Sequence, residues 1–587
     1  MSFRKDINGL RALAVLPVIF FHAGLGSFEG GYLGVDVFFV ISGYLITANI
    51  LSEKKQESFS LLSFYDRRAR RILPPLILTM LIVLFFSFMF MLPYDLKNLG
   101  QSLVATSYGA NNILLYLTSG YWSAAAEYKP LYHTWSLGVE EQYYVIIPMI
   151  FIVLFRYNWL LVACIVSLIL ISFIASSLID SKEFNFLMIL PRFWELGTGS
   201  LLAIYMRNRV QPKSEALSAL GLGLIFTSYV TPNLFSTNQA IVNLLPVLGA
   251  ALVILFTNVD GNVYRLLSQR FFFIIGLSSY SIYLFHQPIL SFLRLYSEGE
   301  VGVVKQLIFS LLAIPLGYFS WKYFESIFRR KEIISNKLFY SLLLFFISFL
   351  TVAGLILHKT YGLQNYGIYT KYSYGVNPQA YADKPYSMAK NEFSSSSKKI
   401  LIIGNSFARD FYNALNENDA FNGYEVIYLY DYYDDVNLSR RLLASADLTF
   451  YVSSSGMGGE INYSLINKVA IERKNELDEH SNGNYYYVGT KNFGSNNNFI
   501  RHHDWEKTKN YMVEINKSNL CADQIEKKIF DDKYISLLDL LRDGDKIRLF
   551  TNDHKFISFD TEHITKDGAV FLGKKFLQST ELKKIIF

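Results

Sequence analysis

The feature that most constrains this sequence is a series of long apolar runs in its first 357 residues. A helix that crosses a bilayer needs about 20 mostly apolar residues, because the hydrocarbon core is about 30 Å thick and each residue rises about 1.5 Å. Eleven runs approach this length, at residues 8–25, 34–51, 73–92, 140–155, 159–178, 187–206, 216–231, 239–257, 271–291, 303–324 and 338–357. The run 99–117 is left out because Ser, Gly and Asn interrupt it. The sequence therefore predicts an α-helical multispanning domain of about eleven helices.

Charged residues divide the chain into a membrane part and a soluble part. Residues 1–357 hold 26 Lys/Arg and 19 Asp/Glu, whereas residues 358–587 hold 29 and 30. The net charge of +6 thus comes from the membrane part and concerns orientation in the bilayer, so we expect no nucleic-acid partner. The two cysteines, Cys164 and Cys521, indicate neither a disulfide framework nor a metal site.

Basic residues alternate between successive predicted loops, as the positive-inside rule expects. With a cytoplasmic N-terminus, the inside segments carry 18 Lys/Arg, and the outside loops carry only Lys97, Lys129, Lys182 and Arg294. An odd number of spans then places residues 358–587 outside the cytoplasm.

The soluble part begins with residues 358–397, which are rich in Tyr, Ser, Asn and Gly and are interpreted as a linker or as an extension of the next domain. Short apolar runs follow at 399–404, 424–430, 448–453 and 484–489, separated by polar helical stretches. Continuous apolar runs are typical of buried parallel strands joined by crossover helices. We therefore expect a three-layer, doubly wound α/β domain over residues 398–587.

Two ionisable residues, Arg11 and His22, lie inside the first predicted span. Their separation of eleven residues returns them to within about 20° of one helix face and sets them about 16 Å apart along the axis. Ionisable groups inside a membrane are costly and usually line a cavity or pair with a functional group. The alternative is an arginine that reaches the interface and a histidine held by a neighbouring helix.

The segment Tyr65–Arg71 holds four arginines at the cytoplasmic end of the third predicted span. They could serve only to orient the loop. However, the planar guanidinium binds phosphates in a bidentate manner, and lysine would serve equally well for orientation. The segment is therefore also a candidate site for a phosphorylated donor on the cytoplasmic side.

Six blocks in this order resemble the membrane acyltransferase family 3 proteins. They are RALAVLPVIFFH (11–22), GYLGVDVFFVISGYLIT (31–47), YDRRARRILPP (65–75), HTWSLGVEEQYY (133–144), PRFWELGTGSLLA (191–203) and SSYSIYLFHQPI (278–289). The resemblance implies transfer of an acyl group, usually acetyl from acetyl-CoA, across the bacterial inner membrane to an extracytoplasmic carbohydrate. It also implies that Arg67, Arg68 and Arg71 handle the donor and that Arg11 and His22 form the Arg-x10-His motif.

Four further polar residues near the outer side of the predicted bundle are weaker candidates: His133, Glu140, Glu141 and His286. A polar bundle interior held together by hydrogen bonds would explain them equally well.

The soluble domain carries a second candidate site. Gly404-Asn405-Ser406 follows its first predicted strand, and Asp560 and His563 lie near its C-terminus, three residues apart. In a Ser-His-Asp site the histidine takes the serine proton and the aspartate fixes the tautomer of the histidine, in any chain order. This arrangement resembles the SGNH hydrolase fold, which implies Ser406 as nucleophile, His563 as base and Asp560 as its partner.

The sequence departs from the SGNH pattern at the oxyanion hole. There is no clear second-block glycine, and SSSGMGG (453–459) stands where an asparagine would be expected. The backbone N–H of Ser406 and one near Gly456 are the donors that remain.

These features predict four segments: an acyltransferase domain (1–330), an additional span (331–357), the linker or extension (358–397) and the SGNH-like domain (398–587). We expect an O-acetyltransferase that uses acetyl-CoA and no metal, lies in the lipid bilayer of the inner membrane and modifies an envelope glycan. Lipopolysaccharide O-antigen is the preferred acceptor and peptidoglycan the alternative. Two other functions are alternatives. An extracytoplasmic carbohydrate esterase would need the Ser-His-Asp site but not the membrane helices, and a transporter would need the helices but not the Ser-His-Asp site.

Overall fold

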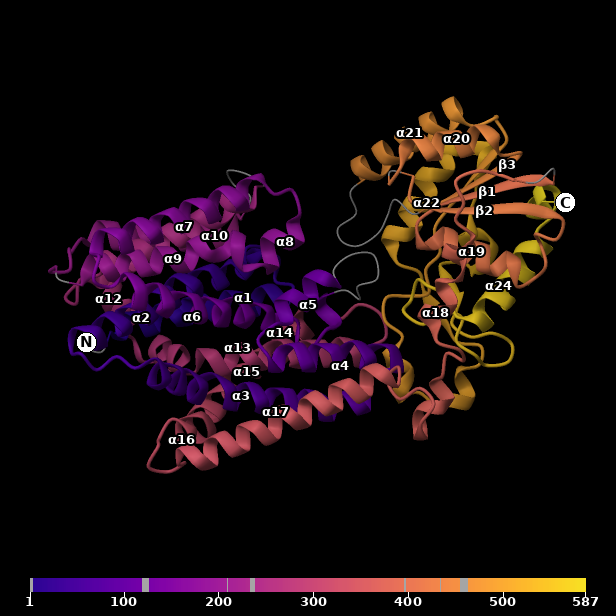
Figure 1. Ribbon diagram of the computed structural model, residues 1–587. Coiled ribbons are helices and arrows are strands. Elements are labelled where there is room, and N and C mark those ends of the chain that lie inside the picture. The colour runs from indigo at the N-terminus through magenta and orange to yellow at the C-terminus, as the bar shows by residue number, and fades with distance from the viewer. Residues whose placement is uncertain are drawn as a thin grey trace. The chain divides into compact units, whose positions relative to one another are not determined.

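A computed structural model describes residues 4–118, 126–207, 209–232, 238–394, 397–432, 434–453 and 463–586. The chain divides into two compact units. The first unit comprises residues 1–89, 98–294 and 300–359, and the second comprises residues 90–97, 295–299 and 360–587. Figure 1 shows the first unit as a bundle of helices and the second as helices around a small sheet.

The described part of the first unit consists mainly of helices joined by loops and 3₁₀ turns. They are α1 (Lys5–His22), α2 (Gly34–Lys55), α3 (Leu61–Phe90), α4 (Pro93–Ser107), α5 (Asn111–Leu117), α6 (Trp135–Leu154), α7 (Asn158–Leu178), α8 (Lys182–Leu187), α9 (Ile189–Met206), α10 (Glu215–Val230), α11 (Gln239–Phe256), α12 (Asn262–Leu267), α13 (Arg270–Tyr296), α14 (Val303–Leu311), α15 (Ala313–Phe319), α16 (Ser326–Phe328) and α17 (Asn336–Lys359), with a π-helical turn at Ser320–Glu325.

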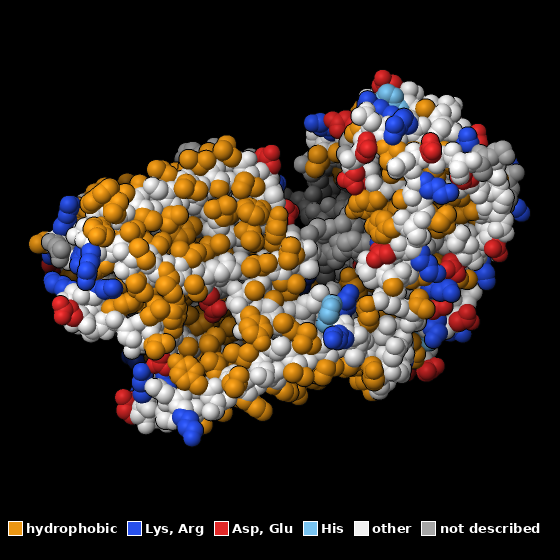
Figure 2. All heavy atoms as spheres, viewed as in Figure 1, with side chains coloured by type: hydrophobic (Ala, Val, Ile, Leu, Met, Phe, Trp, Pro, Cys, Tyr) orange, Lys and Arg blue, Asp and Glu red, His pale blue; other side chains and the backbone are white. Residues whose placement is uncertain are grey.

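All eleven predicted spans fall on these helices, which confirms an apolar helical N-terminal region. Within the described residues, eight helical stretches are long and apolar enough to cross a membrane. Helices α1, α10 and α13 are outside this set, so the number eleven stays a prediction. Figure 2 shows hydrophobic side chains spread over the side of this unit that faces the viewer, with Lys and Arg gathered near the end where α1 begins.

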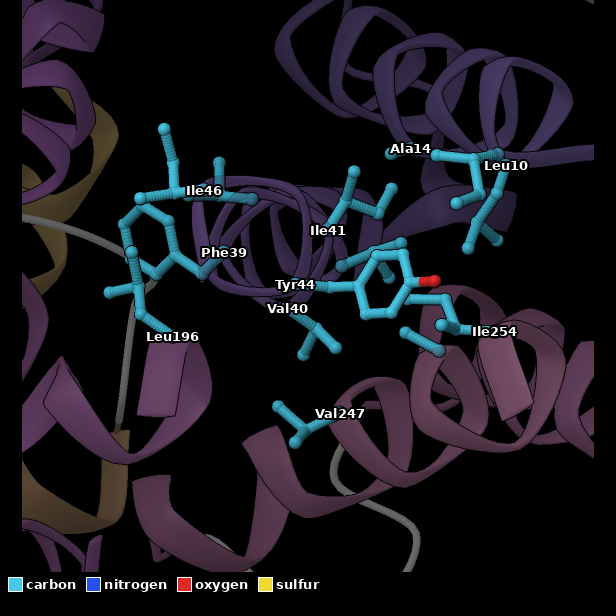
Figure 3. Packing of buried hydrophobic residues seen from close by; sticks show 14 of the residues in the cluster. Leu10, Ala14, Phe39, Val40, Ile41, Tyr44, Ile46, Leu196, Val247 and Ile254 are labelled. Carbon is cyan, nitrogen blue, oxygen red and sulfur yellow. The ribbon is translucent and has the colours of Figure 1, made fainter. Parts of the chain in front are cut away.

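Helix α2 lies at the centre of the bundle. Figure 3 shows its side chains Phe39, Val40 and Tyr44 surrounded by residues of α1, α9 and α11. The backbones of α2 and α9 approach each other closely, because a Cβ on Gly43 would lie only 1.9 Å from the carbonyl oxygen of Leu196. Small residues that permit such contact are typical of membrane helix interfaces, where van der Waals packing replaces the hydrophobic effect.

Helix α3 begins earlier than the third predicted span. The sequence predicts a span at residues 73–92, but the helix starts at Leu61 and carries the whole arginine segment. A helix satisfies its backbone hydrogen bonds internally, so it can continue beyond the hydrocarbon core into a charged segment. The arginines therefore follow helical periodicity and point to different sides of α3.

The second unit contains a five-stranded parallel sheet. Its strands are β1 (Lys398–Gly404), β2 (Tyr424–Tyr430), β3 (Leu448–Val452), β4 (Tyr485–Val488) and β6 (Tyr534–Ile535), in the order β2-β1-β3-β4-β6. The four predicted strands are all present, and the expected parallel α/β region is confirmed. A second, antiparallel sheet holds β5 (Met512–Glu514), β8 (Lys546–Arg548) and β7 (Arg542–Asp543).

Helices cover both faces of the parallel sheet (Figure 1). They are α19 (Ser406–Asn416), α20 (Val436–Ser445), α21 (Tyr463–His480), α22 (Lys517–Phe530), α23 (Leu537–Leu541), α24 (Lys566–Gln578) and α25 (Thr580–Ile586). On one face, Leu401 and Ile403 pack with buried residues of α20 and α21. On the other, the ring of Phe411 in α19 lies 5.3 Å from that of Phe450 in β3. The SGNH assignment of this α/β region stays a prediction.

Two short segments, residues 90–97 and 295–299, join the second unit although they precede its main part in the sequence. Asn498 donates to the carboxylate of Asp95 at 2.6 Å and accepts a hydrogen bond from the Leu92 N–H at 2.6 Å. Asn496 donates to the carbonyl oxygens of Leu295 (3.2 Å) and Ser297 (3.3 Å).

The predicted linker or extension forms short helices in the same unit. They are a 3₁₀ turn at Gly367–Tyr372, α18 (Pro378–Ala382) and a second 3₁₀ turn at Lys384–Met388. Tyr381 and Ala382 of α18 are buried, so this segment is a packed extension.

Candidate functional site

The second unit brings Ser406, His563 and Asp560 together in one chain of hydrogen bonds. Ser406 Oγ lies 2.7 Å from His563 Nε2, and His563 Nδ1 lies 2.7 Å from Asp560 Oδ2. Both Ser406 and His563 are 1% exposed. With Nδ1–H donated to the carboxylate, Nε2 carries the lone pair that can take the serine proton.

The turn that presents Ser406 depends on a glycine. Gly404 ends β1 with φ +141°, and a Cβ there would lie 2.0 Å from the carbonyl oxygen of Val452. Asn405 then caps α19 by accepting the Phe407 N–H at 3.1 Å, so that Ser406 is the first residue of the helix. Ser406 thus lies at the carboxyl edge of the sheet where the strand order reverses, which is where doubly wound folds bind ligands.

The carboxylate of Asp560 is held in a charged state despite its burial. Burial alone would raise its pKa, but the His563 imidazole and the N–H groups of His563 (2.8 Å) and Glu562 (3.0 Å) lower it below the ordinary value. Those two N–H groups bind Oδ1, which leaves Oδ2 for His563. Asp560 is therefore fixed in the orientation that a His-Asp pair requires.

A buried ion pair, which the sequence does not predict, connects the helix that carries Ser406 to the segment that carries His563. Lys491 Nζ lies 2.8 Å from Asp410 Oδ2, with side chains 3% and 1% exposed. The same oxygen accepts the N–H of Ile564 at 3.1 Å. Asp410 lies four residues after Ser406 in α19, and Ile564 follows His563, so this pair positions serine and histidine relative to each other.

The oxyanion hole is only partly described. Residues 454–462, which include the candidate Gly456, lie outside the described residues. Asn405 Nδ2 donates to Ser453 Oγ at 3.3 Å, which joins the serine turn to the end of β3. The Ser406 N–H stays a predicted oxyanion donor, since the first N–H groups of a helix have no intrahelical partner.

The first unit contains a cavity lined by residues of the five helices α1, α2, α3, α6 and α13. Arg11 of α1, Arg68 and Arg71 of α3, and Glu140 of α6 line it together with hydroxyl groups of Ser42, Tyr144, Tyr280 and others. Glu140 accepts hydrogen bonds from Ser42 (2.9 Å) and Tyr144 (2.8 Å). Three guanidinium groups around one cavity are suited to an anionic, phosphate-bearing ligand.

The remaining arginines of the segment have other contacts. Arg70 is buried and bound to Asp66 (3.1 Å), to the carbonyl oxygens of Phe328 and Ile334, and to Asn336. Arg67, a predicted donor residue, is outside the cavity lining and pairs with Glu53 at 2.6 Å, with 41% of its side chain exposed. The structure therefore places Arg68 and Arg71 with Arg11 and separates Arg67 from them.

His22 belongs to a different cluster from Arg11. Its ring lies 5.1 Å from that of His286, which in turn lies 5.3 Å from that of His133. His22 Nδ1 lies 2.8 Å from the Val18 carbonyl oxygen, and His286 Nδ1 lies 2.5 Å from that of Tyr283. These contacts favour Nδ1–H tautomers and leave Nε2 as the basic nitrogen of both rings. Two of the weaker candidates thus join His22, whereas Glu141 is outside both the cavity lining and this cluster.

Among the residues that the structure describes, no group of three or more His, Cys, Asp or Glu is arranged to hold a metal ion.

The bundle also contains a buried charged group. Arg192 lies 3.3 Å from Asp36 and 3.1 Å from Glu195. This group holds α2 against α9 and lies outside the cavity lining.

Comparisons with known proteins agree with the boundaries of the helical unit. A family model described as an acyltransferase domain matches residues 4–358. The chain is 28% identical over 354 residues to the O-acetyltransferase OatA of Staphylococcus aureus, which covers 56% of this chain and 58% of that protein. It is 30% identical over 313 residues to the peptidoglycan O-acetyltransferase OatA of Listeria monocytogenes, which covers 49% and 50%.

An uncharacterized protein of Haemophilus influenzae is 36% identical over 236 residues, which is 38% of this chain and 96% of that protein. The chain spans about half the length of the two OatA relatives. No solved structure matches the chain. The family match covers more than half of the sequence and contains the arginine cavity and the histidine cluster, and so this chain belongs to the membrane acyltransferase family 3.

Proposed function

We propose that the chain is an O-acetyltransferase that carries an acetyl group from cytoplasmic acetyl-CoA across the membrane to a hydroxyl group of an envelope glycan. The observation that carries this proposal is the Ser406-His563-Asp560 relay in the same chain as an acyltransferase-family unit. Arg11, Arg68 and Arg71 would hold the donor phosphates, and His22 would act on the thioester.

In the second half of the reaction, Ser406 would carry the acetyl group. Its Oγ attacks the carbonyl carbon of the acetyl group that the membrane unit supplies, and His563 Nε2 takes the serine proton. As the bond between the acetyl group and the sulfur or oxygen of its carrier breaks, His563 gives this proton to the departing carrier, which leaves an acetyl-serine and a neutral His563. A glycan hydroxyl then attacks this ester while His563 removes its proton, and the proton returns to Ser406 Oγ as the bond to the acetyl group breaks.

The names of the relatives change the acceptor that we propose from lipopolysaccharide O-antigen to peptidoglycan. The Listeria relative is named for peptidoglycan, and the other matched enzyme carries the same OatA name. These relatives favour the peptidoglycan alternative over the lipopolysaccharide O-antigen. Comparing the O-acetyl content of both polymers between a wild-type strain and a deletion strain separates the two acceptors.

The proposed direction requires a cytoplasmic N-terminus and an extracytoplasmic second unit in the bacterial inner membrane. A reporter fused after Lys359, the last residue of α17, is expected to report an extracytoplasmic position. A cytoplasmic signal from this fusion would contradict the relay.

Membrane vesicles that contain acetyl-labelled acetyl-CoA on the cytoplasmic side test the reaction itself. The full chain is expected to transfer label to an external glycan, and both Ser406→Ala and His22→Ala are expected to abolish transfer. Only Ser406→Ala should also abolish hydrolysis of nitrophenyl acetate, because His22 belongs to the other unit. Normal transfer by Ser406→Ala would remove the serine from the pathway and leave the membrane unit as the complete transferase.

A further inference from the structure

Two partly exposed tyrosine rings lie beside the strand that leads to Ser406. Tyr386, from the extension, is 40% exposed, and Tyr430, at the end of β2, is 37% exposed. Their ring centroids are 5.8 Å apart with an interplanar angle of 60°. Two partly exposed rings in contact with each other offer an aromatic face on which a ligand can stack.

The register of the sheet places the backbone of Tyr430 beside the turn that carries the nucleophile. Tyr430 is the partner of Gly404 in the β1–β2 pairing, and Gly404 precedes Ser406 by two residues. Neighbouring strands are about 4.8 Å apart. The Asp431 N–H donates to the Gly404 carbonyl oxygen at 3.1 Å, and Tyr428 OH donates to that of Asn405 at 3.4 Å.

A buried arginine fixes the extension against the nucleophile helix. Arg409 lies in α19 three residues after Ser406 and is 0% exposed. Its Nη1 donates to Asp383 Oδ1 at 2.7 Å, and its guanidinium lies 5.8 Å from the ring centre of Tyr386. Tyr386 also packs on Tyr428 at 5.7 Å. The exposed ring of Tyr386 is therefore held at a defined position relative to Ser406.

Charged groups of both signs lie near the two rings: Asp431 and Asp434 act on Tyr430, and the buried Arg409 beside Tyr386 is paired with Asp383. Partial burial, together with Tyr386, Asp431 and Asp434, raises the pKa of Tyr430, which keeps its hydroxyl neutral and able to donate. Carboxylates and tyrosine hydroxyls can bind the hydroxyl groups of a sugar, and the faces of aromatic rings can stack on its C–H bonds. Because Asp383 neutralises the buried Arg409, the carboxylates of Asp431 and Asp434 disfavour a polyanionic ligand at Tyr430.

We propose that Tyr386 and Tyr430 form the acceptor subsite, in which they stack on uncharged sugar rings of the glycan and bring a hydroxyl group to the acetyl-serine. This inference rests on the proposed function, which makes Ser406 the final donor. It gives the extension at residues 360–394 a direct role: it supplies one of the two rings that select the acceptor.

Affinity for a chemically defined sugar chain tests this subsite without turnover. The probe is a soluble N-acetylglucosamine tetramer, titrated calorimetrically into the full chain that carries Ser406→Ala. Adding Tyr386→Ala or Tyr430→Ala is expected to weaken binding about tenfold, as for truncation of a buried aromatic anchor. The matched Phe variants keep the ring and should stay within about threefold of the parent. Tyr463→Ala, at a 62% exposed tyrosine of α21, is the control and should leave the affinity unchanged.

Loss of affinity in the Ala variants and its retention in the Phe variants supports the subsite. Unchanged affinity in both Ala variants, or a parent that does not bind the tetramer, overturns it. Circular dichroism of each variant shows whether the fold is intact, and the Phe variants decide the question if an Ala variant unfolds. Normal label transfer by Ser406→Ala would defeat the proposed function, whereas the affinity series would still report on the subsite.

Discussion

Replacement of Asp560 by Asn should inactivate the serine site while preserving its shape. Asp560 Oδ1 accepts two backbone N–H groups, so the carbonyl oxygen of an asparagine would occupy that position and its NH₂ group would face His563 Nδ1. An NH₂ donor there favours the tautomer with hydrogen on Nε2. His563 would then donate to Ser406 Oγ at 2.7 Å instead of accepting its proton.

The expected loss is about ten-thousandfold in the rate, as for the same exchange in other Ser-His-Asp sites. It corresponds to about 5.4 kcal/mol in activation free energy, at about 1.36 kcal/mol for each factor of ten. The assay is hydrolysis of nitrophenyl acetate by the full chain in detergent, with Ser406→Ala as the baseline. Glu562→Gln is the matched control, because Glu562 contacts Asp560 through its backbone N–H, and its rate should fall by less than about threefold. An Asp560→Asn protein within tenfold of the parent rate would refute the assignment.

The lowered pKa of Asp560 adds a stability readout to the same variant. A carboxylate whose pKa is lower in the folded state stabilises the fold above its ordinary pKa and loses this contribution as the pH falls through the lowered value. The difference in unfolding free energy between parent and Asp560→Asn should therefore be largest near neutral pH and shrink on acidification. A difference that grows in acid would contradict the hydrogen bonds described for Asp560.

Two further predictions concern charges elsewhere in the chain. Replacing both Arg68 and Arg71 by Lys should preserve insertion but lower transfer about tenfold at limiting acetyl-CoA, because lysine cannot make paired contacts to phosphate, whereas Arg67→Lys should transfer normally. Normal transfer by the double variant would mean that Arg68 and Arg71 only orient the loop in the membrane and do not bind the donor. Lys491→Met leaves the Asp410 carboxylate buried without its cation and should cost about 3–5 kcal/mol in thermal unfolding, and adding Asp410→Asn should recover most of this loss. A single variant as stable as the parent would contradict the buried pair.

The parts of this structure that sequence could predict are those that depend on local pattern. Continuous apolar runs predict four strands that the structure contains. Short motifs at the two ends of the domain predict Ser406 and His563 as site residues, and the structure brings them within 2.7 Å of each other. The sequence does not predict that Arg67 lies apart from Arg68, because the predicted span begins only at residue 73. In the structure both residues belong to α3, where neighbouring positions point to different faces of the helix. Lys491 could not be predicted, since its partner lies 81 residues away in the sequence and no local pattern connects them.

Because Asn496 and Asn498 bind residues 90–97 and 295–299, the boundary of the second unit does not coincide with any single cut in the chain. A fragment that begins at residue 358 would lack the hydrogen bonds to Leu92, Asp95, Leu295 and Ser297. The same constraint applies to exchange between relatives: a C-terminal half transplanted onto a different acyltransferase bundle would meet foreign loops at both places. Successful chimeras should therefore be those that transfer the two loops together with the C-terminal half, because these three separate stretches of sequence form one structural module.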